Sequence, residues 1–202
     1  MKIIAVTQRV AIAPGHLERR DCLDQAWPRF LRACGLLPLL LPNLPETAID
    51  LIGRLPVAGL LLTGGNDLAS LGGDAPERDA TEMALLAQAE RRNMPVIGVC
   101  RGMQVIQSRH GVALRRIDGH VAATQVITVH GQRAEVNSFH HFGSTEPAPL
   151  TLETWAVADD GVQKGIRDTS RPIIGVMWHP ERFAAPRAQD IELFRRHIGV
   201  NK

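Results

Sequence analysis

One cysteine stands where it could serve as a nucleophile. Residues 95–104 read PVIGVCRGMQ, so an apolar run leads directly into Cys100, with a glycine two residues to either side of it. Small neighbours allow the sharp strand-to-helix turn that presents a nucleophile, and the start of a helix lowers the pKa of a thiol. The N–H group of Arg101 could then face an oxyanion formed beside the thiol. Taken alone, the segment also fits a buried cysteine that ends a core strand.

A histidine and a glutamate follow a second apolar run. Residues 173–181 read IIGVMWHPE, which places His179 at the end of a predicted strand and Glu181 two residues later. An imidazole at this edge could act as general base toward a thiol, and a nearby carboxylate could orient the ring. Taken alone, the same segment also fits an exposed histidine beside a glutamate.

Two further segments could contact a ligand. In residues 60–67, LLLTGGND, the glycine pair Gly64-Gly65 allows close approach of the backbone, either as a donor loop for an oxyanion or as a plain turn. No Gly-Lys-Ser/Thr follows, so a Walker phosphate loop is not expected.

In residues 137–141, NSFHH, adjacent histidines on a strand would point to opposite faces, which disfavours a shared metal. A substrate-contact loop and a buried, hydrogen-bonded histidine both remain open there.

Apolar patterning predicts the elements that position these groups. Strands are expected at residues 2–7, 36–41, 57–63, 95–99, 121–129, 133–138, 150–158 and 172–178. Helices are expected at residues 21–34, 45–55, 77–92 and 101–110, with a last one opened by Pro186. The early alternation of strand and helix predicts an α/β fold with a mostly parallel sheet, and the later strands add a small antiparallel part. The length predicts one domain over residues 1–202.

Composition narrows the classes of protein and partner. Apolar residues make up 45% and the net charge is +2, which argues against a disordered chain and against nucleic-acid or membrane-surface binding through bulk charge. Cys22, Cys34 and Cys100 are the only cysteines and form no CxxC pair, so neither a disulfide scaffold nor a zinc site is expected. The longest apolar stretch, Leu36–Leu41, contains Pro38 and is too short to cross a bilayer. We therefore expect a cytoplasmic protein.

Together the four segments resemble the class I glutamine amidotransferase-like family, and within it the γ-glutamyl hydrolase branch that includes γ-glutamyl-γ-aminobutyrate hydrolases. The motifs that carry the resemblance are GVCRGMQ at 98–104, VMWHPE at 176–181, VNSFHH at 136–141 and ADDG at 158–161. The resemblance implies a flavodoxin-like three-layer sandwich with Cys100 at the carboxyl edge of the sheet. That placement agrees with the general location of ligands in open α/β sheets.

The resemblance also implies roles for individual residues. Cys100 would be the nucleophile, His179 the base and Glu181 the group that orients it. The backbone N–H groups of Gly65 and Arg101 would form the oxyanion hole. The substrate-binding residues would be Gln104, Asn137, Ser138, Phe139 and His140. No metal and no organic cofactor would be required.

The chain departs from this branch at three positions outside the implied triad. Met177 and Phe142 stand where the branch often has Gln, and Lys164 stands where it usually has Glu. Residues 19–27, RRDCLDQAW, look like the γ-glutamyl-CDP-amidate hydrolases within the branch, and Arg9, Arg19 and Arg20 could then meet phosphates. A solvated helix end is the alternative for Arg19 and Arg20. The leaving group therefore stays open between this nucleotide amidate and another γ-glutamyl amine.

The expected partner is a small-molecule γ-glutamyl substrate, whose amide bond a Cys100 thiolate would cleave through a thioester. A homodimer stays open. The first alternative is a glutaminase subunit that delivers ammonia to a separate synthetase chain. The second is a non-catalytic binding module on the same fold, and the third is a stress-type α/β protein with a reactive cysteine.

Overall fold

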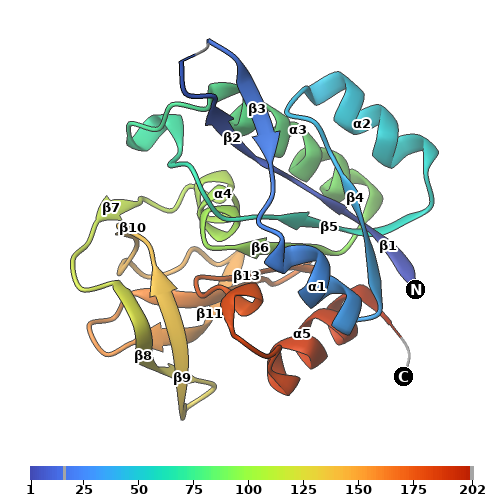
Figure 1. The fold of residues 1–202 in the computed structure, drawn as a ribbon. Coiled ribbons are helices and arrows are strands. Elements are labelled where there is room, and N and C mark those ends of the chain that lie inside the picture. Colours follow the sequence, from blue (N-terminus) through green and yellow to red (C-terminus); the bar gives the residue numbers. More distant parts are fainter. Residues whose placement is uncertain (16, 201–202) are drawn as a thin grey trace.

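The computed structural model describes residues 1–15 and 17–200, and a nine-stranded sheet forms its centre (Figure 1). Five neighbouring strands run parallel, in the order β4 (Leu36–Leu40), β1 (Lys2–Val6), β5 (Val57–Leu62), β6 (Val96–Val99) and β13 (Ile173–Val176). The sheet continues with antiparallel strands β12 (Gln163–Asp168), β11 (Leu152–Ala158), β8 (Val121–Val129) and β9 (Gln132–Phe139). These antiparallel strands occupy the lower left of Figure 1, away from both termini.

Helices cover both faces of the parallel strands. Helices α1 (Ala26–Ala33) and α5 (Ala188–Ile198) pack on one face, and α2 (Pro45–Arg54), α3 (Pro76–Arg92) and α4 (Arg101–Arg109) on the other. Side chains alternate between faces along a strand. Leu61 of β5 accordingly joins Phe30 and Phe194 in one buried cluster, while Leu60 joins Leu85 in the other. This arrangement confirms the predicted three-layer α/β fold.

The predicted first helix is wrong over its first turn. Arg19–Cys22 is strand β3, paired antiparallel with β2 (Arg9–Ile12), and the helix begins only at Ala26. The Asp24 carboxylate accepts a hydrogen bond from the Ala26 N–H at 2.9 Å and so fixes the turn before the helix. Cys22 therefore does not share a helix with Cys34, which is buried at the end of α1.

Other differences concern short or polar segments. Strand β12 was not predicted because its sequence, QKGIRD, lacks an apolar pattern. A two-stranded ribbon of β7 (Arg115–Arg116) and β10 (Phe142–Gly143) was also missed. Strand β9 ends at Phe139, so the two histidines that follow are not on a strand. His140 is buried and His141 is exposed.

The sheet brings three polar segments to one edge. Strands β5, β6 and β13 are adjacent and parallel, so their carboxyl ends lie side by side. The Thr63–Asp67 loop, Cys100 and the 177–181 segment follow these three ends. Two short 3₁₀ turns, Ala69–Leu71 and Pro180–Arg182, complete the described helices, none of which is long and apolar enough to cross a membrane.

Candidate active site

Cys100 occupies a strained turn between β6 and α4. Its φ of +53° and ψ of −107° are rare for a residue with a side chain. Two glycines make room for the turn: a Cβ on Gly98 would lie 2.5 Å from the Gly102 carbonyl oxygen, and one on Gly102 would lie 2.1 Å from the Leu62 carbonyl oxygen. The Cys100 N–H donates to the Val176 carbonyl at 2.8 Å, which fixes the turn to β13. The turn thus has the geometry expected of a nucleophile elbow.

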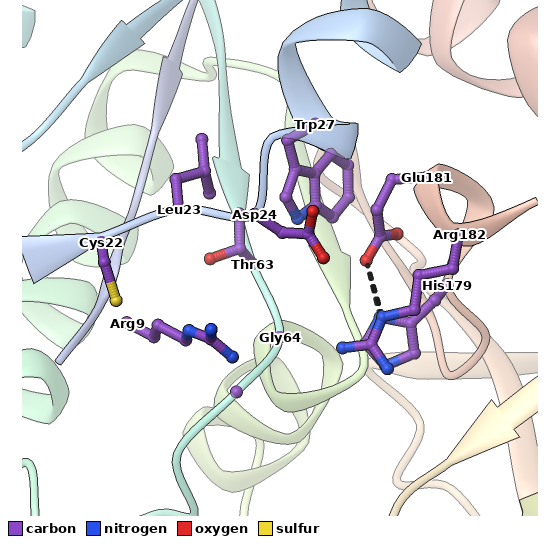
Figure 2. Close-up of a pocket in the computed structure, with 11 residues that line it drawn as sticks. Arg9, Cys22, Leu23, Asp24, Trp27, Thr63, Gly64, His179, Glu181 and Arg182 are labelled. Atoms are coloured by element: carbon purple, nitrogen blue, oxygen red, sulfur yellow. Dashed lines mark hydrogen bonds and ion pairs between the residues drawn. The ribbon is translucent and has the colours of Figure 1, made fainter. Parts of the chain in front are cut away.

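His179 is held on both its backbone and its ring. The Asn137 side chain accepts from the His179 N–H at 2.7 Å and donates to the His179 carbonyl at 2.8 Å. The ring nitrogen Nδ1 lies 2.8 Å from the Glu181 carboxylate, drawn as the dashed line in Figure 2. Because a carboxylate only accepts, Nδ1 carries a proton. The buried Nε2 has no hydrogen bond at conventional distance within the described residues, which suits a ring whose counterpart is a larger, softer thiol.

Electrostatics favour a charged pair of thiolate and imidazolium. Burial raises the pKa of the Cys100 thiol, but His179, the Arg101 N–H and Arg182 outweigh burial and hold that pKa below its usual value. Burial lowers the pKa of His179, but the Cys100 thiolate and Glu181 outweigh it and raise the pKa to about 9. Each member of the pair therefore stabilises the charged form of the other. A thiolate is the nucleophilic form of cysteine.

A fully buried arginine fixes the glycine loop. The Arg78 guanidinium donates to the Thr63 carbonyl at 2.7 Å, to the Gly64 carbonyl at 3.1 Å and to the Gly65 carbonyl. Because all three carbonyls point toward Arg78, the orientation of the loop backbone is fixed. Gly65 in this loop has a φ of +84°. The loop can thereby keep N–H groups aimed at a reacting carbonyl oxygen without reorganisation.

The same arginine belongs to a buried ionic cluster that also contains Arg101. The carboxylate of Glu82, which has no exposed surface, accepts from Arg78 at 2.9 Å, from Thr7 at 2.7 Å and from Arg101. Arg101 also pairs with Asp79. Its side chain is therefore turned away from the thiol, and only its backbone N–H faces Cys100.

Two cavities flank Cys100 and His179. The first, which we call the Cys100 cavity, encloses about 220 Å³ and is lined by Gly65, Asn66, Asp67, Cys100, Arg101, Gln104, Phe139, His140 and His141. The second, which we call the Arg9 cavity, encloses only about 20 Å³, and Figure 2 shows the residues that line it. Its lining includes Arg9, Asp24, Trp27 and Arg182, together with His179 and Glu181. Cys100 thus lines the larger cavity, while His179 and Glu181 line the smaller one, where two arginines stand beside Asp24.

The structure separates the predicted ligand-binding residues into two groups. Gln104, Phe139 and His140 line the Cys100 cavity, and the Phe139 carbonyl lies 4.0 Å from the thiol sulfur. Asn137 and Ser138 are buried behind it: Asn137 is engaged with the His179 backbone, and Ser138 donates to the His120 carbonyl. Their direct contact with substrate stays a prediction, whereas their contacts show how the cavity wall is held.

Arg19 and Arg20 have partners on the surface. Arg19 pairs with Glu77 and Arg20 with Glu18. Arg9, by contrast, lines the Arg9 cavity and forms no ion pair within the described residues. Of the three arginines singled out in the sequence, Arg9 is therefore the one placed to meet a ligand.

Sequence reasoning missed the buried charges that support the site. Arg78 and Glu82 are spaced i, i+4 on α3, a pattern that reads as an ordinary exposed helical pair. Lys164 is buried on β12 and donates to Ser138 and His140. In the sequence, the one sign that Lys164 is unusual is that it stands where the γ-glutamyl hydrolase branch usually has Glu. Within the described residues, no group of three or more His, Cys, Asp or Glu side chains could hold a metal ion.

Solved structures share the fold. The glutaminase domain of the Trypanosoma brucei CTPS superposes with a TM-score of 0.72 at 15% identity, covering 100% of this chain and 95% of that chain. A Thermoplasma acidophilum protein that is named for GMP synthase superposes with a TM-score of 0.72 at 20% identity, covering 98% of this chain and 93% of that chain. A likeness at this level of identity establishes the architecture, which is flavodoxin-like. The chemistry has to be argued from the residues of the site, because proteins of one fold can have different functions.

Sequence relatives carry several activities. Protein NtpR of Enterococcus hirae is 30% identical over 78% of this chain and 80% of its own length. Gamma-glutamyl-CDP-amidate hydrolase of Campylobacter jejuni is 26% identical over 89% of this chain and 90% of its own length. The carbamoyl phosphate synthase small chain of Maricaulis maris is 29% identical over 86% of this chain and 44% of its own length.

The match to a described family spans most of the chain. It covers residues 2–126 and 109–181, which include the Cys100 elbow, the glycine loop and His179 with Glu181. The resemblance seen in the motifs is thereby confirmed: the chain belongs to the Peptidase C26 family, a class I glutamine amidotransferase-like family whose relatives support a hydrolase or amidase activity.

Proposed function

We propose that the protein is a cysteine-dependent hydrolase of γ-glutamyl amide bonds. The observation that carries the proposal is the Cys100 elbow, which lines an open cavity of about 220 Å³, beside a His179 ring that Glu181 holds at 2.8 Å. Family membership supports amide chemistry at this place.

The reaction follows from these groups in two steps. The Cys100 thiolate attacks the γ-carbonyl carbon, and the N–H groups of Gly65 and Arg101 stabilise the oxyanion. Protonated His179 then gives its proton to the leaving nitrogen, the C–N bond breaks, and a γ-glutamyl thioester remains on Cys100. Neutral His179 next takes a proton from water, whose hydroxide attacks the thioester; the C–S bond breaks, glutamate leaves, and the Cys100 thiolate is restored beside protonated His179. Glu181 keeps the ring in the required tautomer throughout.

The finer substrate assignment rests on the cavity beside His179. Arg9 lines this small opening of about 20 Å³ without an ion pair within the described residues, and its guanidinium group suits an anionic leaving group that passes the opening; Arg182 lines it too but pairs with Glu181 at 3.6 Å. A γ-glutamyl-CDP-amidate, whose leaving group carries a diphosphate, fits this charge, and the Campylobacter jejuni relative bears the name of that activity. A γ-glutamyl amine such as γ-glutamyl-γ-aminobutyrate, with its terminal carboxylate, is the second substrate of this kind.

One observation favours a different function. The carbamoyl phosphate synthase small chain of Maricaulis maris covers 86% of this chain, so a glutaminase subunit with a separate synthetase partner is the main alternative. This alternative uses the same proposed nucleophile and base, but under it the isolated chain should have low activity.

Glutamate release by the purified protein alone distinguishes these functions. The panel contains glutamine, γ-glutamyl-γ-aminobutyrate, γ-glutamyl-putrescine and γ-glutamyl-CDP-amidate, with Cys100→Ala as the inactive variant and Cys34→Ala as the matched cysteine control. We expect turnover of an anionic γ-glutamyl compound that is lost only in Cys100→Ala. Turnover of glutamine only when a synthetase-containing extract is added would favour the glutaminase subunit. No turnover under either condition would favour a binding module.

A further inference from the structure

Lys164 places an ammonium group in the protein interior without a carboxylate partner. Lys164 is 1% exposed and is the second residue of β12. Its nitrogen lies 3.0 Å from the Ser138 hydroxyl and 2.6 Å from His140 Nε2. It forms no salt bridge within the described residues, although Asp160 and Cys100 attract it from farther away. The proposed reaction gives this residue no part.

Both hydrogen-bond partners of Lys164 are neutral acceptors. The Ser138 hydroxyl donates its own proton to the His120 carbonyl at 2.8 Å, so its oxygen accepts from the ammonium. His140 Nδ1 lies 2.9 Å from the Phe142 carbonyl oxygen, which only accepts, so the ring proton is on Nδ1. Nε2 therefore accepts from Lys164, and the pKa of His140, lowered by burial and then by Lys164 to about 3, keeps this ring neutral.

The charge of Lys164 consequently has no directly bonded counter-ion within the described residues, and Asp160 and Cys100 offset it only from farther away. Burial of an ionised group without a counter-ion is unfavourable, and an anion that binds nearby recovers part of that free energy. His140 connects this charge to the site, because its ring also lines the Cys100 cavity. The Arg101 guanidinium does not compete for the anion, since it is engaged with Glu82 and Asp79.

The opposite charge lies at the rim of the same cavity. Asp67 lines it, is exposed and forms no ion pair within the described residues. The cavity therefore has a cation behind its inner wall and an anion at its rim. An amino acid head group, with one carboxylate and one ammonium, matches this pair of charges.

We infer that Lys164, acting through His140, determines specificity for an acyl group that carries an α-carboxylate. Lys164 does not touch the substrate and is a positioning residue. Its positive charge polarises His140, so the part of the Cys100 cavity that His140 lines favours the carboxylate of a γ-glutamyl group. Asp67 faces the α-ammonium of the same group. This inference rests on the proposed function and adds the residue by which the acyl half would be selected.

Equilibrium binding tests the inference without requiring turnover. In the Cys100→Ala background, the ligands are L-glutamine and 4-aminobutanamide, which differ only in the α-carboxylate. We expect Lys164→Met to weaken glutamine binding by roughly tenfold, the scale of one through-space attraction between unit charges at the effective dielectric of a protein, and to leave 4-aminobutanamide binding unchanged. Lys2→Met, at a lysine that donates to the Ile198 and Gly199 carbonyls, is the matched control and should change neither affinity.

Kinetics supply the second arm. For γ-glutamyl substrates turned over in the panel above, Lys164→Met should raise KM for the carboxylate-bearing substrate and leave kcat/KM of its decarboxylated analogue unchanged. Equal losses for both ligands in either arm would assign Lys164 a purely structural role and overturn the inference. An unchanged preference for the carboxylate would also overturn it. If binding shows the expected preference but no γ-glutamyl compound is turned over, the proposed function fails and the binding inference stands.

Discussion

Cys100 and His179 interact as a thiolate and an imidazolium, and this pairing is the central feature at the scale of single residues. Neither group would be charged in this way by burial alone, because burial disfavours both charged forms. The pairing therefore depends on their mutual contact, and removing one partner should change the titration of the other.

The pKa of His179 provides a direct test of this dependence. NMR titration of the wild-type protein should give a value of about 9, and Cys100→Ala should lower it, because the thiolate that favours the protonated ring is gone. His197, whose ring lies at hydrogen-bond distance from the Val96 and Pro172 carbonyls, should titrate alike in both proteins. A His179 pKa that stays the same or rises in Cys100→Ala would contradict the ion pair.

At the scale of elements, three strand ends place the site, and the loops that follow them are packed tightly against the reacting pair. Gly64 shows this best. A Cβ at Gly64 would lie 2.7 Å from His179 Cε1 and 3.4 Å from Cys100 Cβ, so a side chain there must displace the ring.

Gly64→Ala should therefore lower kcat by about tenfold or more, since a small displacement of a reacting group carries a large penalty. Gly53→Ala is the matched control: it lies within α2, its nearest atom is Arg92 Nη2 at 3.6 Å, and it should leave kcat unchanged. Steady-state kinetics with circular dichroism to verify folding makes the comparison. Full activity of Gly64→Ala would show that the loop does not set the position of His179.

Helix α3 acts on the same loop through Arg78. Loss of its hydrogen bonds to the Thr63, Gly64 and Gly65 carbonyls should free the loop and weaken oxyanion stabilisation. Arg78→Met should lower kcat by roughly 10²-fold with a smaller change in KM, which is the size of losing one oxyanion donor.

Arg78→Lys keeps the charge and should recover part of the rate. This second variant matters because the arginine is fully buried and Arg78→Met could reduce stability as well. Equal activity of the two variants, both folded by circular dichroism, would mean that Arg78 supports the fold alone and does not organise the loop.

At the scale of the whole molecule, the cluster of Glu82 with Arg78 and Arg101 joins α3, α4 and the loop after β5. Burial raises the pKa of Glu82, but the two arginines and Thr7 outweigh burial and hold it below its usual value. A carboxylate with a lowered pKa in the folded protein stabilises the fold above its unfolded pKa of about 4.3, and this contribution is lost as the pH falls through the folded value.

Urea denaturation across the acidic range should show this contribution. Glu82→Gln should be less stable than the wild type at neutral pH, and the difference should shrink as the pH falls below the unfolded pKa toward the lowered pKa of the folded carboxylate. Glu153→Gln, at an exposed pair with Arg167, should show only a small difference at any pH. A deficit in Glu82→Gln that does not vary with pH would contradict the ionic role of this carboxylate.

How much of this could be predicted from the sequence depends on whether a local pattern carried the information. The Cys100 elbow, the parallel strands and the helices after them follow from apolar runs, glycine spacing and strand-to-helix order. The β2–β3 hairpin and β12 could not be predicted this way, because RRDC and QKGIRD have no apolar alternation and become strands only by pairing with β2 and with β11 and β13, respectively. The same limit applies to Lys164 and Arg78, whose burial is a property of the packed fold.

The most direct test of the account is to capture the covalent intermediate on Cys100. The protein is mixed with a γ-glutamyl substrate, quenched rapidly in acid and analysed by intact-mass and peptide mass spectrometry. We predict a mass increase of one γ-glutamyl group, located on the peptide that contains Cys100 and absent from Cys100→Ala and from the protein incubated with glutamate alone. Release of glutamate at an undiminished rate by Cys100→Ala, with no adduct on the wild-type enzyme, would contradict the proposed chemistry.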